Sequence, residues 1–312
     1  MQLYLAPLQG LTDWIFREAY TEHIGKFDKT FSPFIRAQNG DFYRPSQCND
    51  IIPARNTFQV PVPQFLGNNT PSFQRFEALC HLHQYTEVNI NLGCPFSRVI
   101  NKSMGAGLLS QPERIAEMLE EIFAITKLKV SIKCRLGQAE TSEFEKLIPI
   151  FNNYPFEEVI IHPRLGKQMY KGEIYYDEFA RYAPLLKHSV CYNGDISSIA
   201  DIEKIQALTP AIDRFMIGRG LLQQPFLLAQ LRGQELTHDQ KVKMIRNFHL
   251  SVIEYCKQKY SGDLHLLRRF VELWSYHAEA FEDGRKILKN IKKCNTLAKY
   301  EAVIFKAIND IK

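Results

Sequence analysis

The sequence predicts an α/β protein, with a TIM-type (β/α)8 barrel over residues 1–236 and a small all-helical bundle over residues 237–312. Eight short apolar runs alternate with longer amphipathic stretches up to about residue 232, which is the rhythm and length of a closed parallel barrel. No strand pattern follows. A doubly wound open sheet is the alternative, but it is expected to carry Gly-x-Gly-x-x-Gly after the first strand, and Pro7-Leu8-Gln9-Gly10 offers none.

The predicted strands are apolar runs of four to seven residues, at 3–6, 31–36, 60–66, 88–92, 130–135, 159–162, 190–193 and 215–218. The predicted barrel helices are amphipathic stretches at 72–83, 112–125, 142–151, 176–186, 199–208 and 221–231. The second unit, residues 31–60, is the least regular and is rich in Asn, Pro and aromatic residues. We therefore expect an irregular loop over the barrel mouth there.

The bundle is predicted to begin at a capping box, Thr-x-x-Gln, formed by Thr237 and Gln240. Four helical patterns follow it, at 239–260, 264–281, 284–293 and 297–308. Their lengths and short connections are typical of a helical bundle appended to the barrel.

Charge is spread unevenly along the chain. Residues 238–312 carry 15 Lys+Arg against 9 Asp+Glu, whereas residues 1–237 carry 24 against 25. Arg285, Lys289, Lys292 and Lys293 recur at helical spacing, with Arg268 and Arg269 on the preceding helix, and a phosphate backbone would satisfy that pattern. A basic segment on a near-neutral body indicates a polyanionic partner. The alternative is a lysine-rich helix surface that only contacts water.

The composition of 45% hydrophobic and 23% charged residues is that of an ordinary globular chain. Seven cysteines occur without a Cys-x-x-Cys pair, so neither a disulfide framework nor a metal site is indicated. No basic leader with a cleavage site and no apolar run of membrane-spanning length is found, and we expect a cytoplasmic monomer without a membrane partner.

Polar residues gather where the predicted strands end, which is where barrels of this kind place their active sites. Cys94 lies between Gly93 and Pro95 at the tip of the fourth strand, and a thiol there could be a general acid, a nucleophile or inert packing. Lys133 and Arg135 alternate on one face of the fifth strand. An inward Lys133 requires an anionic or polar partner, unless it reaches water at the strand end.

Two glycine-containing turns follow the seventh and eighth strands, at Asn193-Gly194-Asp195 and Gly218-Arg219-Gly220. Barrels commonly bind a phosphate at these two positions on backbone amides. Arg219 would add a bidentate donor. The turns therefore predict a phosphate site, with two ordinary tight turns as the alternative.

Seven motifs occur in order along the chain: LAPLQGLTD (5–13), QFLG (64–67), NLGCP (91–95), KCRLG (133–137), HPR (162–164), NGDI (193–196) and IGRG (217–220). Together they resemble the tRNA-dihydrouridine synthase family, and the four-helix tail is most similar to the bacterial subgroup C enzymes. The resemblance covers essentially the whole chain. It implies a flavin-binding barrel and a helical tRNA-binding domain that reduce a D-loop uridine of tRNA with FMN and NADPH.

The resemblance also implies roles for individual residues. The residues implied in FMN binding are Pro7, Leu8, Gln64, Lys133, His162, Asn193, Gly194, Asp195, Gly218 and Arg219. The residues implied to face the flipped uracil are Asn91, Arg135, Arg164 and Tyr170, and the basic tail adds Arg285 and Lys289 as tRNA contacts. Cys94 would be the acid that protonates C5 while hydride reaches C6, because a thiol of pKa about 8.5 is protonated at neutral pH.

The sequence departs from the family pattern at four positions, where Leu8 stands for Met, Asn89 for Asp, Arg98 for Lys and Pro163 for Gly. Leu8 keeps an apolar contact, and Arg98 keeps a positive charge. Asn89 removes a carboxylate, and Pro163 stiffens the loop that carries Arg164.

Two other functions remain open. One is a flavin-dependent barrel enzyme acting on a free small molecule such as a dihydropyrimidine, which needs no basic tail. The other is a non-enzymatic RNA-binding barrel, which would not take up FMN.

Overall fold

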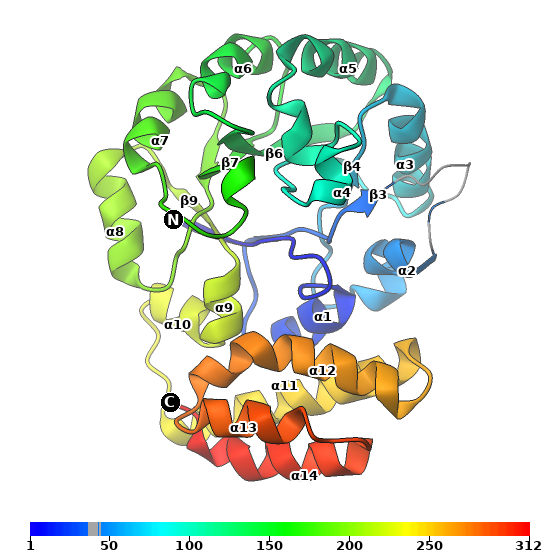
Figure 1. Cartoon of the computed structure of the whole chain (residues 1–312), viewed down its shortest axis with the longest axis vertical. Helices are drawn as coiled ribbons and strands as arrows, with labels where there is room; N and C mark the ends of the chain where they lie inside the picture. Colours follow the sequence, from blue (N-terminus) through cyan, green and yellow to red (C-terminus); the bar gives the residue numbers. More distant parts are fainter. Residues whose placement is uncertain (37–42, 44) are drawn as a thin grey trace.

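The computed structural model describes residues 1–36, 43 and 45–312, and its centre is a parallel β-sheet (Figure 1). Its strands are β1 Gln2–Leu5, β2 Lys29–Thr30, β3 Ile35–Arg36, β4 Gln64–Leu66, β5 Glu87–Leu92, β6 Lys129–Gly137, β7 Val159–Leu165, β8 Val190–Tyr192 and β9 Arg214–Ile217. They are hydrogen-bonded in the order β2-β1-β9-β8-β7-β6-β5-β4-β3, and every neighbouring pair is parallel.

The sheet closes on itself, which makes it a barrel. Its two outer strands, β2 and β3, belong to one stretch of chain, residues 29–36. Phe31 forms a parallel bridge with Val62, just before β4, and the Val62 amide donates to the Thr30 carbonyl at 2.8 Å. Counting β2 and β3 as one strand therefore gives the predicted eight positions around a closed ring.

Prolines account for the main differences between predicted and observed elements. Pro33 interrupts the second strand, and Pro61 and Pro63 confine the third to β4, because proline has no amide hydrogen for the ladder. The helix predicted over 221–231 is two helices, α9 Arg219–Gln223 and α10 Leu227–Leu231, separated by Pro225.

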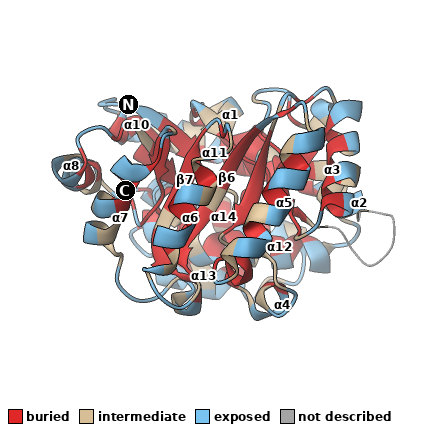
Figure 2. Cartoon of the chain, turned by 90° about the horizontal axis from the view of Figure 1, so that it is seen from above, coloured by how far each residue is buried: buried red, intermediate tan, exposed pale blue. Residues whose placement is uncertain are grey.

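Five of the remaining barrel helices lie on predicted stretches: α3 Thr70–Leu82, α5 Pro112–Ile125, α6 Glu143–Phe151, α7 Tyr176–Tyr182 and α8 Ile199–Leu208. Two short helices, α2 Pro45–Cys48 and α4 Ser97–Ile100, were not predicted. Figure 1 shows α3, α5, α6, α7 and α8 around the outside of the sheet. Figure 2 shows buried strands inside this ring and exposed outer faces on its helices, which is the burial expected of amphipathic helices covering a barrel.

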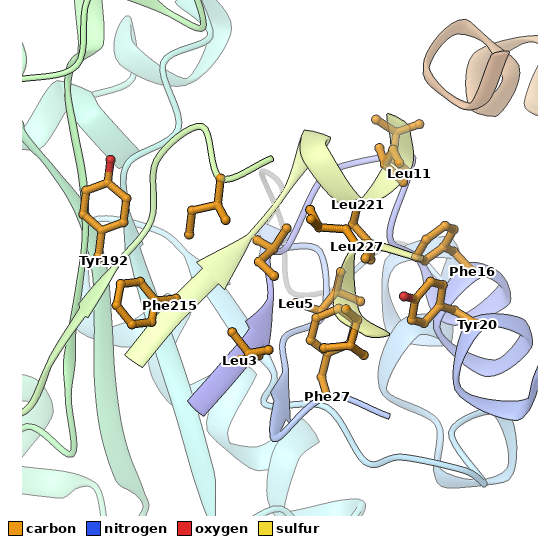
Figure 3. Packing of buried hydrophobic residues seen from close by; sticks show 14 of the residues in the cluster. Leu3, Leu5, Leu11, Phe16, Tyr20, Phe27, Tyr192, Phe215, Leu221 and Leu227 are labelled. Carbon is orange, nitrogen blue, oxygen red and sulfur yellow. The ribbon is translucent and has the colours of Figure 1, made fainter. Parts of the chain in front are cut away.

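Helix α1, Trp14–His23, has no counterpart among the predicted amphipathic stretches. All its residues from 14 to 20 are buried, and the charged Arg17 and Glu18 are among them. Figure 3 shows Phe16 and Tyr20 of α1 beside Leu221 of α9 and Leu227 of α10. On its other side Phe16 meets Phe248 of the bundle edge-on, with ring centroids 5.6 Å apart. Barrel and bundle thus share one apolar core through α1.

The four predicted bundle helices are present as α11 His238–Lys259, α12 Asp263–His277, α13 Gly284–Ile291 and α14 Leu297–Ala307. The capping box is confirmed, since the Thr237 amide donates to Gln240 Oε1 at 2.8 Å and the Gln240 amide to Thr237 Oγ1 at 3.3 Å.

The expectation that Arg269 faces a phosphate backbone is wrong. It is buried and pairs with Asp13 of the barrel, Nη2 to Oδ1 at 3.1 Å.

The expected irregular loop between residues 36 and 60 falls partly outside the described residues, at positions 37–42 and 44. Its described part contains α2 and two short 3-10 turns, Asn49–Ile51 and Pro53–Arg55. Among all described helices, none combines the length and apolar character that crossing a membrane requires.

Two buried histidines of the bundle predict an acid-sensitive fold. Burial lowers the pKa of His277 to about 4 and that of His249 well below its usual range. Below about pH 6.5 the unfolded chain binds protons that the folded chain does not bind, so stability falls as the pH falls. The effect of His277 alone lowers the free energy of unfolding by up to about 3 kcal/mol at pH 4.

We expect the variant His249→Phe to lose less stability than wild type between pH 7 and pH 5. The phenyl ring keeps the stacking on Trp274, whose ring centroid lies 5.1 Å from that of His249, and does not titrate. Urea denaturation at pH 7, 6 and 5 measures the difference. Equal pH dependence in both proteins would contradict a neutral, buried His249.

Candidate active site

A cavity of about 590 Å³ opens at the carboxyl ends of the strands. Its lining includes residues from the ends of six strands and from the loops that follow them. The predicted site residues that line it are Pro7, Leu8, Asn91, Cys94, Lys133, Arg135, His162, Tyr170, Asn193, Gly194, Asp195, Gly218 and Arg219. The barrel therefore brings together residues that are up to 212 positions apart in the chain.

Four predicted site residues do not line the cavity. Gln64 is fully buried behind Asn91, and Arg164 is buried behind Asp195. Arg285 and Lys289 lie on α13, with exposed side chains outside the cavity.

A chain of amide hydrogen bonds supports the Cys94 loop from below. Asn91 Oδ1 accepts from the backbone amides of Gly93 at 3.0 Å and Cys94 at 2.9 Å. Asn91 Nδ2 donates to Gln64 Oε1 at 2.7 Å, and Gln64 Nε2 donates to Asn89 Oδ1 at 2.8 Å. These bonds fix both amide side chains, so Asn91 positions the backbone that carries Cys94.

The amide at position 89 has a clear local use. Asn89 Nδ2 donates to Ser131 Oγ at 3.0 Å while its Oδ1 accepts from Gln64. A carboxylate could accept from Gln64 but could not donate to Ser131. The departure from the family's Asp therefore gives a neutral, satisfied contact at a fully buried position.

Cys94 is only 6% exposed and packs on Leu66 and Val99 at the cavity wall. Burial raises the pKa of its thiol above the usual range, so the group is protonated at neutral pH. Gly105, at a φ of 55°, lies directly over it, because a Cβ at Gly105 would come within 2.9 Å of the Cys94 carbonyl. The loop that carries Gly105 therefore packs on the backbone of Cys94, and a side chain at position 105 would not fit there.

Lys133 and Arg135 place positive charge on the cavity wall. Burial and the neighbouring Arg135 lower the pKa of Lys133 to about 8, and within the described chain its Nζ has no hydrogen-bond or ion-pair partner. Arg135 is fixed by the carbonyls of Gly93 at 2.9 Å and Leu165 at 2.8 Å, and its guanidinium lies 5.5 Å from the ring centroid of Tyr170. Lys133 is therefore available to an anionic or polar ligand.

His162 is held as a neutral donor. Arg164 Nη1 lies 3.2 Å from His162 Nε2, and because arginine can only donate, Nε2 accepts and the proton sits on Nδ1. Burial, with the nearby charges of Arg135 and Lys133, lowers the pKa of His162 well below its usual range. Its Nδ1–H has no acceptor in the part of the protein that is described, which leaves it for a ligand.

The two turns predicted to bind a phosphate pack against each other. A Cβ at Gly220 would come within 2.1 Å of the Ile196 carbonyl, so only glycine allows this approach. Within the described residues, the backbone amides of Gly194, Asp195 and Gly218 donate to no protein acceptor. Unpaired amides on a cavity wall are the donor set that an anion requires.

Arg219 joins the two turns. Its Nη2 pairs with Asp195 Oδ1 at 2.7 Å, and its guanidinium lies 5.4 Å from the ring centroid of Tyr170. Asp195 also pairs with Arg164, whose Nη1 lies 3.0 Å from Oδ1. Burial opposes ionisation of Asp195, but the two arginines outweigh it and hold the pKa of the carboxyl below its usual range. One carboxylate between two guanidinium groups leaves this wall positively charged.

Sequence reasoning missed several lining residues. The principal ones are Phe34, Phe96, Gln223, Glu272 and Tyr276. Phe96 follows Cys94-Pro95 directly, so its position next to the thiol was an available signal. Glu272 and Tyr276 are one turn apart on α12, but nothing in the sequence indicates that this helix lies at the barrel mouth.

The described residues contain no group of three or more His, Cys, Asp or Glu side chains placed to hold a metal ion.

A family model described as dihydrouridine synthase (Dus) matches residues 4–310. A probable tRNA-dihydrouridine synthase of Helicobacter pylori strain J99 is 28% identical, over 96% of this chain and 89% of the relative. A tRNA-dihydrouridine(16) synthase of Cupriavidus necator is 26% identical over 74% of each chain. A second Helicobacter pylori relative, from strain 26695, is 30% identical over 74% of this chain and 70% of its own.

Proposed function

The chain belongs to the dihydrouridine synthase family, and from this premise we propose a flavin-dependent reduction of uridine in tRNA, with FMN as the bound cofactor and NADPH as the reductant. It is an oxidoreductase that converts uridine in tRNA to dihydrouridine. The observation that carries the flavin assignment is the set of unpaired donors on the cavity wall: the amides of the two turns, Lys133 Nζ and His162 Nδ1.

The donors fit FMN in chemical kind. The unpaired amides of Gly194, Asp195 and Gly218, with Arg219, suit a phosphate, which is a multivalent acceptor. Lys133 and His162 suit the carbonyl and nitrogen edge of an isoalloxazine. Pro7 and Leu8 give the apolar contact that a flat ring requires. FMN, when bound, supplies the hydride for C6 of uracil.

The protein's own contribution is the proton and the charge around it. Burial keeps Cys94 protonated at neutral pH, and the Asn91 contacts fix its backbone, so the thiol is placed to give a proton to C5 of a uracil in the cavity. Lys133 and Arg135 oppose negative charge that develops on the reacting ring. The base must leave its stack to reach this depth, as in other enzymes that act on a base.

We assign tRNA binding to the helical residues 237–312 and FMN binding to the barrel, residues 1–236. The exposed basic side chains of this part include Arg268, Arg285, Lys289, Lys292 and Lys293. Arg269 is not among them because it is buried against Asp13. The cytoplasmic location and the monomeric state stay predictions.

Neutralising Arg285 and Lys289 is expected to weaken tRNA binding and its salt dependence. Removing one cation that neutralises a phosphate lowers the slope of log Kd against log salt by about 1. The double variant Arg285→Gln/Lys289→Gln is compared with Lys127→Gln, which removes an exposed charge just before β6, at the opposite end of the barrel. Fluorescence anisotropy measures both slopes between roughly 50 and 200 mM salt, because the affinity of a protein that contacts several phosphates falls steeply over this range. An unchanged slope would remove α13 from the tRNA surface.

The function is tested by incubating the FMN-loaded protein with NADPH and tRNA that lacks dihydrouridine, and detecting dihydrouridine by mass spectrometry. Formation of dihydrouridine supports the proposal. A protein that oxidises NADPH only with free dihydropyrimidine-like acceptors would instead be a small-molecule enzyme, and one that binds tRNA without taking up FMN would be a non-enzymatic RNA-binding protein.

Arg219→Ala is expected to weaken FMN retention by roughly tenfold or more, because hydrogen bonds to charged groups are worth about 1.5–3 kcal/mol. Flavin fluorescence during dialysis measures retention. Arg232→Ala, which removes an arginine from a surface pair with Asp28 outside the cavity, is the control. Retention equal to wild type in Arg219→Ala would show the phosphate assignment to be wrong.

A further inference from the structure

The helical bundle contributes a wall to the barrel's cavity. Glu272 and Tyr276 of α12 both line it, although the other lining residues come from the barrel. The opposite face of α12 is buried in the bundle core through Phe270, Leu273 and Trp274. The two side chains therefore project from a helix that cannot rotate.

The position of α12 over the mouth is fixed by contacts of Glu272 itself and of Arg269, one turn earlier. One turn earlier, Arg269 donates to the Leu11 carbonyl at 2.9 Å and pairs with Asp13. Glu272 itself lies against the loop after β1, since a Cβ at Gly10 would come within 3.2 Å of Glu272 Oε1. The carboxylate thus stands beside the loop that holds Pro7 and Leu8.

The Glu272 carboxylate has no hydrogen-bond or ion-pair partner within the described residues, although it is exposed at the mouth. A carboxylate repels the phosphates of an approaching RNA, so its productive partners are neutral N–H and O–H groups. A nucleotide offers these on its ribose and on its base edge. The hydroxyl of Tyr276 is equally without a partner in the described chain, and its ring faces the same cavity as Tyr170 and Phe96.

We propose that Glu272 and Tyr276 form a nucleotide-positioning pair at the cavity mouth. Glu272 accepts a hydrogen bond from an N–H or O–H group of the tRNA nucleotide that enters the cavity, and Tyr276 packs its ring against that nucleotide. The inference rests on the tRNA function proposed above. It makes α12 a part of the substrate site as well as a part of the tRNA-gripping bundle.

The test measures tRNA affinity of the FMN-loaded protein at several salt concentrations, for wild type, Glu272→Ala, Glu272→Gln and Tyr276→Ala. Glu272→Ala is expected to raise Kd about tenfold, the size of one hydrogen bond to a charged group. The slope of log Kd against log salt stays at the wild-type value, because a carboxylate neutralises no phosphate. Glu272→Gln keeps an acceptor oxygen and loses less affinity than the alanine variant. Tyr276→Ala also raises Kd about tenfold, because alanine cannot stack on a base.

Glu282→Ala is the matched control, since it removes an exposed acidic side chain of the same bundle that does not line the cavity. Its Kd stays at the wild-type value. If Glu272 only repels the RNA, both Glu272 variants bind more tightly than wild type, and the proposal is overturned. Unchanged affinity in both Glu272→Ala and Tyr276→Ala overturns it as well.

A tRNA with 2′-deoxyuridine at the reduced position distinguishes the two sources of the hydrogen bond. If the ribose hydroxyl donates to Glu272, the deoxy tRNA binds the wild-type protein more weakly than unmodified tRNA does. The Glu272→Ala variant then binds the two tRNAs equally. If a base N–H donates, the deoxy change affects both proteins equally. A wild-type protein that forms no dihydrouridine would refute the tRNA function itself, whereas an active wild type with unaffected variants refutes only the positioning pair.

Discussion

Cys94→Ala is expected to slow dihydrouridine formation by about 100-fold or more, the usual contribution of a positioned general acid. The thiol is buried, protonated at neutral pH and located on the cavity wall. In the proposed reaction, reduction of the flavin by NADPH involves no uracil, so this half should proceed at close to the wild-type rate. Stopped-flow absorbance, with NADPH alone and then with tRNA added to the reduced enzyme, measures the two halves separately.

Two further variants sharpen this prediction. Cys94→Ser should match the alanine variant or fall between it and wild type, because a hydroxyl is a far poorer acid than a thiol. Cys134→Ala is the matched control, since Cys134 is fully buried on the neighbouring strand β6 and does not line the cavity. It should lose stability but keep both half-reactions. Normal oxidation by tRNA in Cys94→Ala would leave Cys94 with a packing role only.

Most of the barrel could be predicted from the sequence because the patterns that indicate its strands and helices lie within short stretches of the chain. Strands such as β5 and β6 alternate apolar and polar residues with a period of two, and helices such as α5 and α8 lie on amphipathic stretches at the predicted bounds. Helix α1 was not among the predicted stretches, and its residues 14–20 are buried in the fold, the charged Arg17 and Glu18 included. Its burial depends on α11, which lies more than 200 residues further along the chain.

The same distinction applies to the site. Lys133, His162 and Arg219 could be expected to converge because the carboxyl ends of parallel strands meet at one end of a barrel. Whether a side chain lines the cavity or lies behind it is decided by packing, and Gln64 and Arg164 are both held behind it by hydrogen bonds to other site residues. Glu272 and Tyr276 reach the cavity only through the docking of α12, which no local pattern encodes.

That docking depends on a buried ion network, whose loss should have the largest effect on stability. Asp13 caps α1 and pairs with Lys259 at 2.8 Å and with Arg269 at 3.1 Å, and all three side chains are largely buried. Burial alone would raise the pKa of Asp13, but the two cations outweigh it and lower the pKa. Arg269→Ala leaves this carboxylate underpaired in the shared core, which typically costs about 3–5 kcal/mol.

Arg269→Ala is therefore expected to unfold at much lower urea concentration than wild type, and barrel and bundle should unfold together because α1 joins their cores. Asp13→Asn/Arg269→Met should recover part of the loss, since the amide keeps the cap of α1 without a charge and methionine fills the space of the arginine stem. Arg268→Ala, one residue earlier and exposed, is the control and should change stability little. Urea denaturation is followed by circular dichroism, which reports the helices of both parts, and by flavin fluorescence, which reports the cavity of the barrel. An unfolding midpoint equal to that of wild type would contradict the stabilising role of the network. If flavin release preceded or followed the loss of helix in Arg269→Ala, the apolar core shared through α1 would not be enough to make barrel and bundle unfold together.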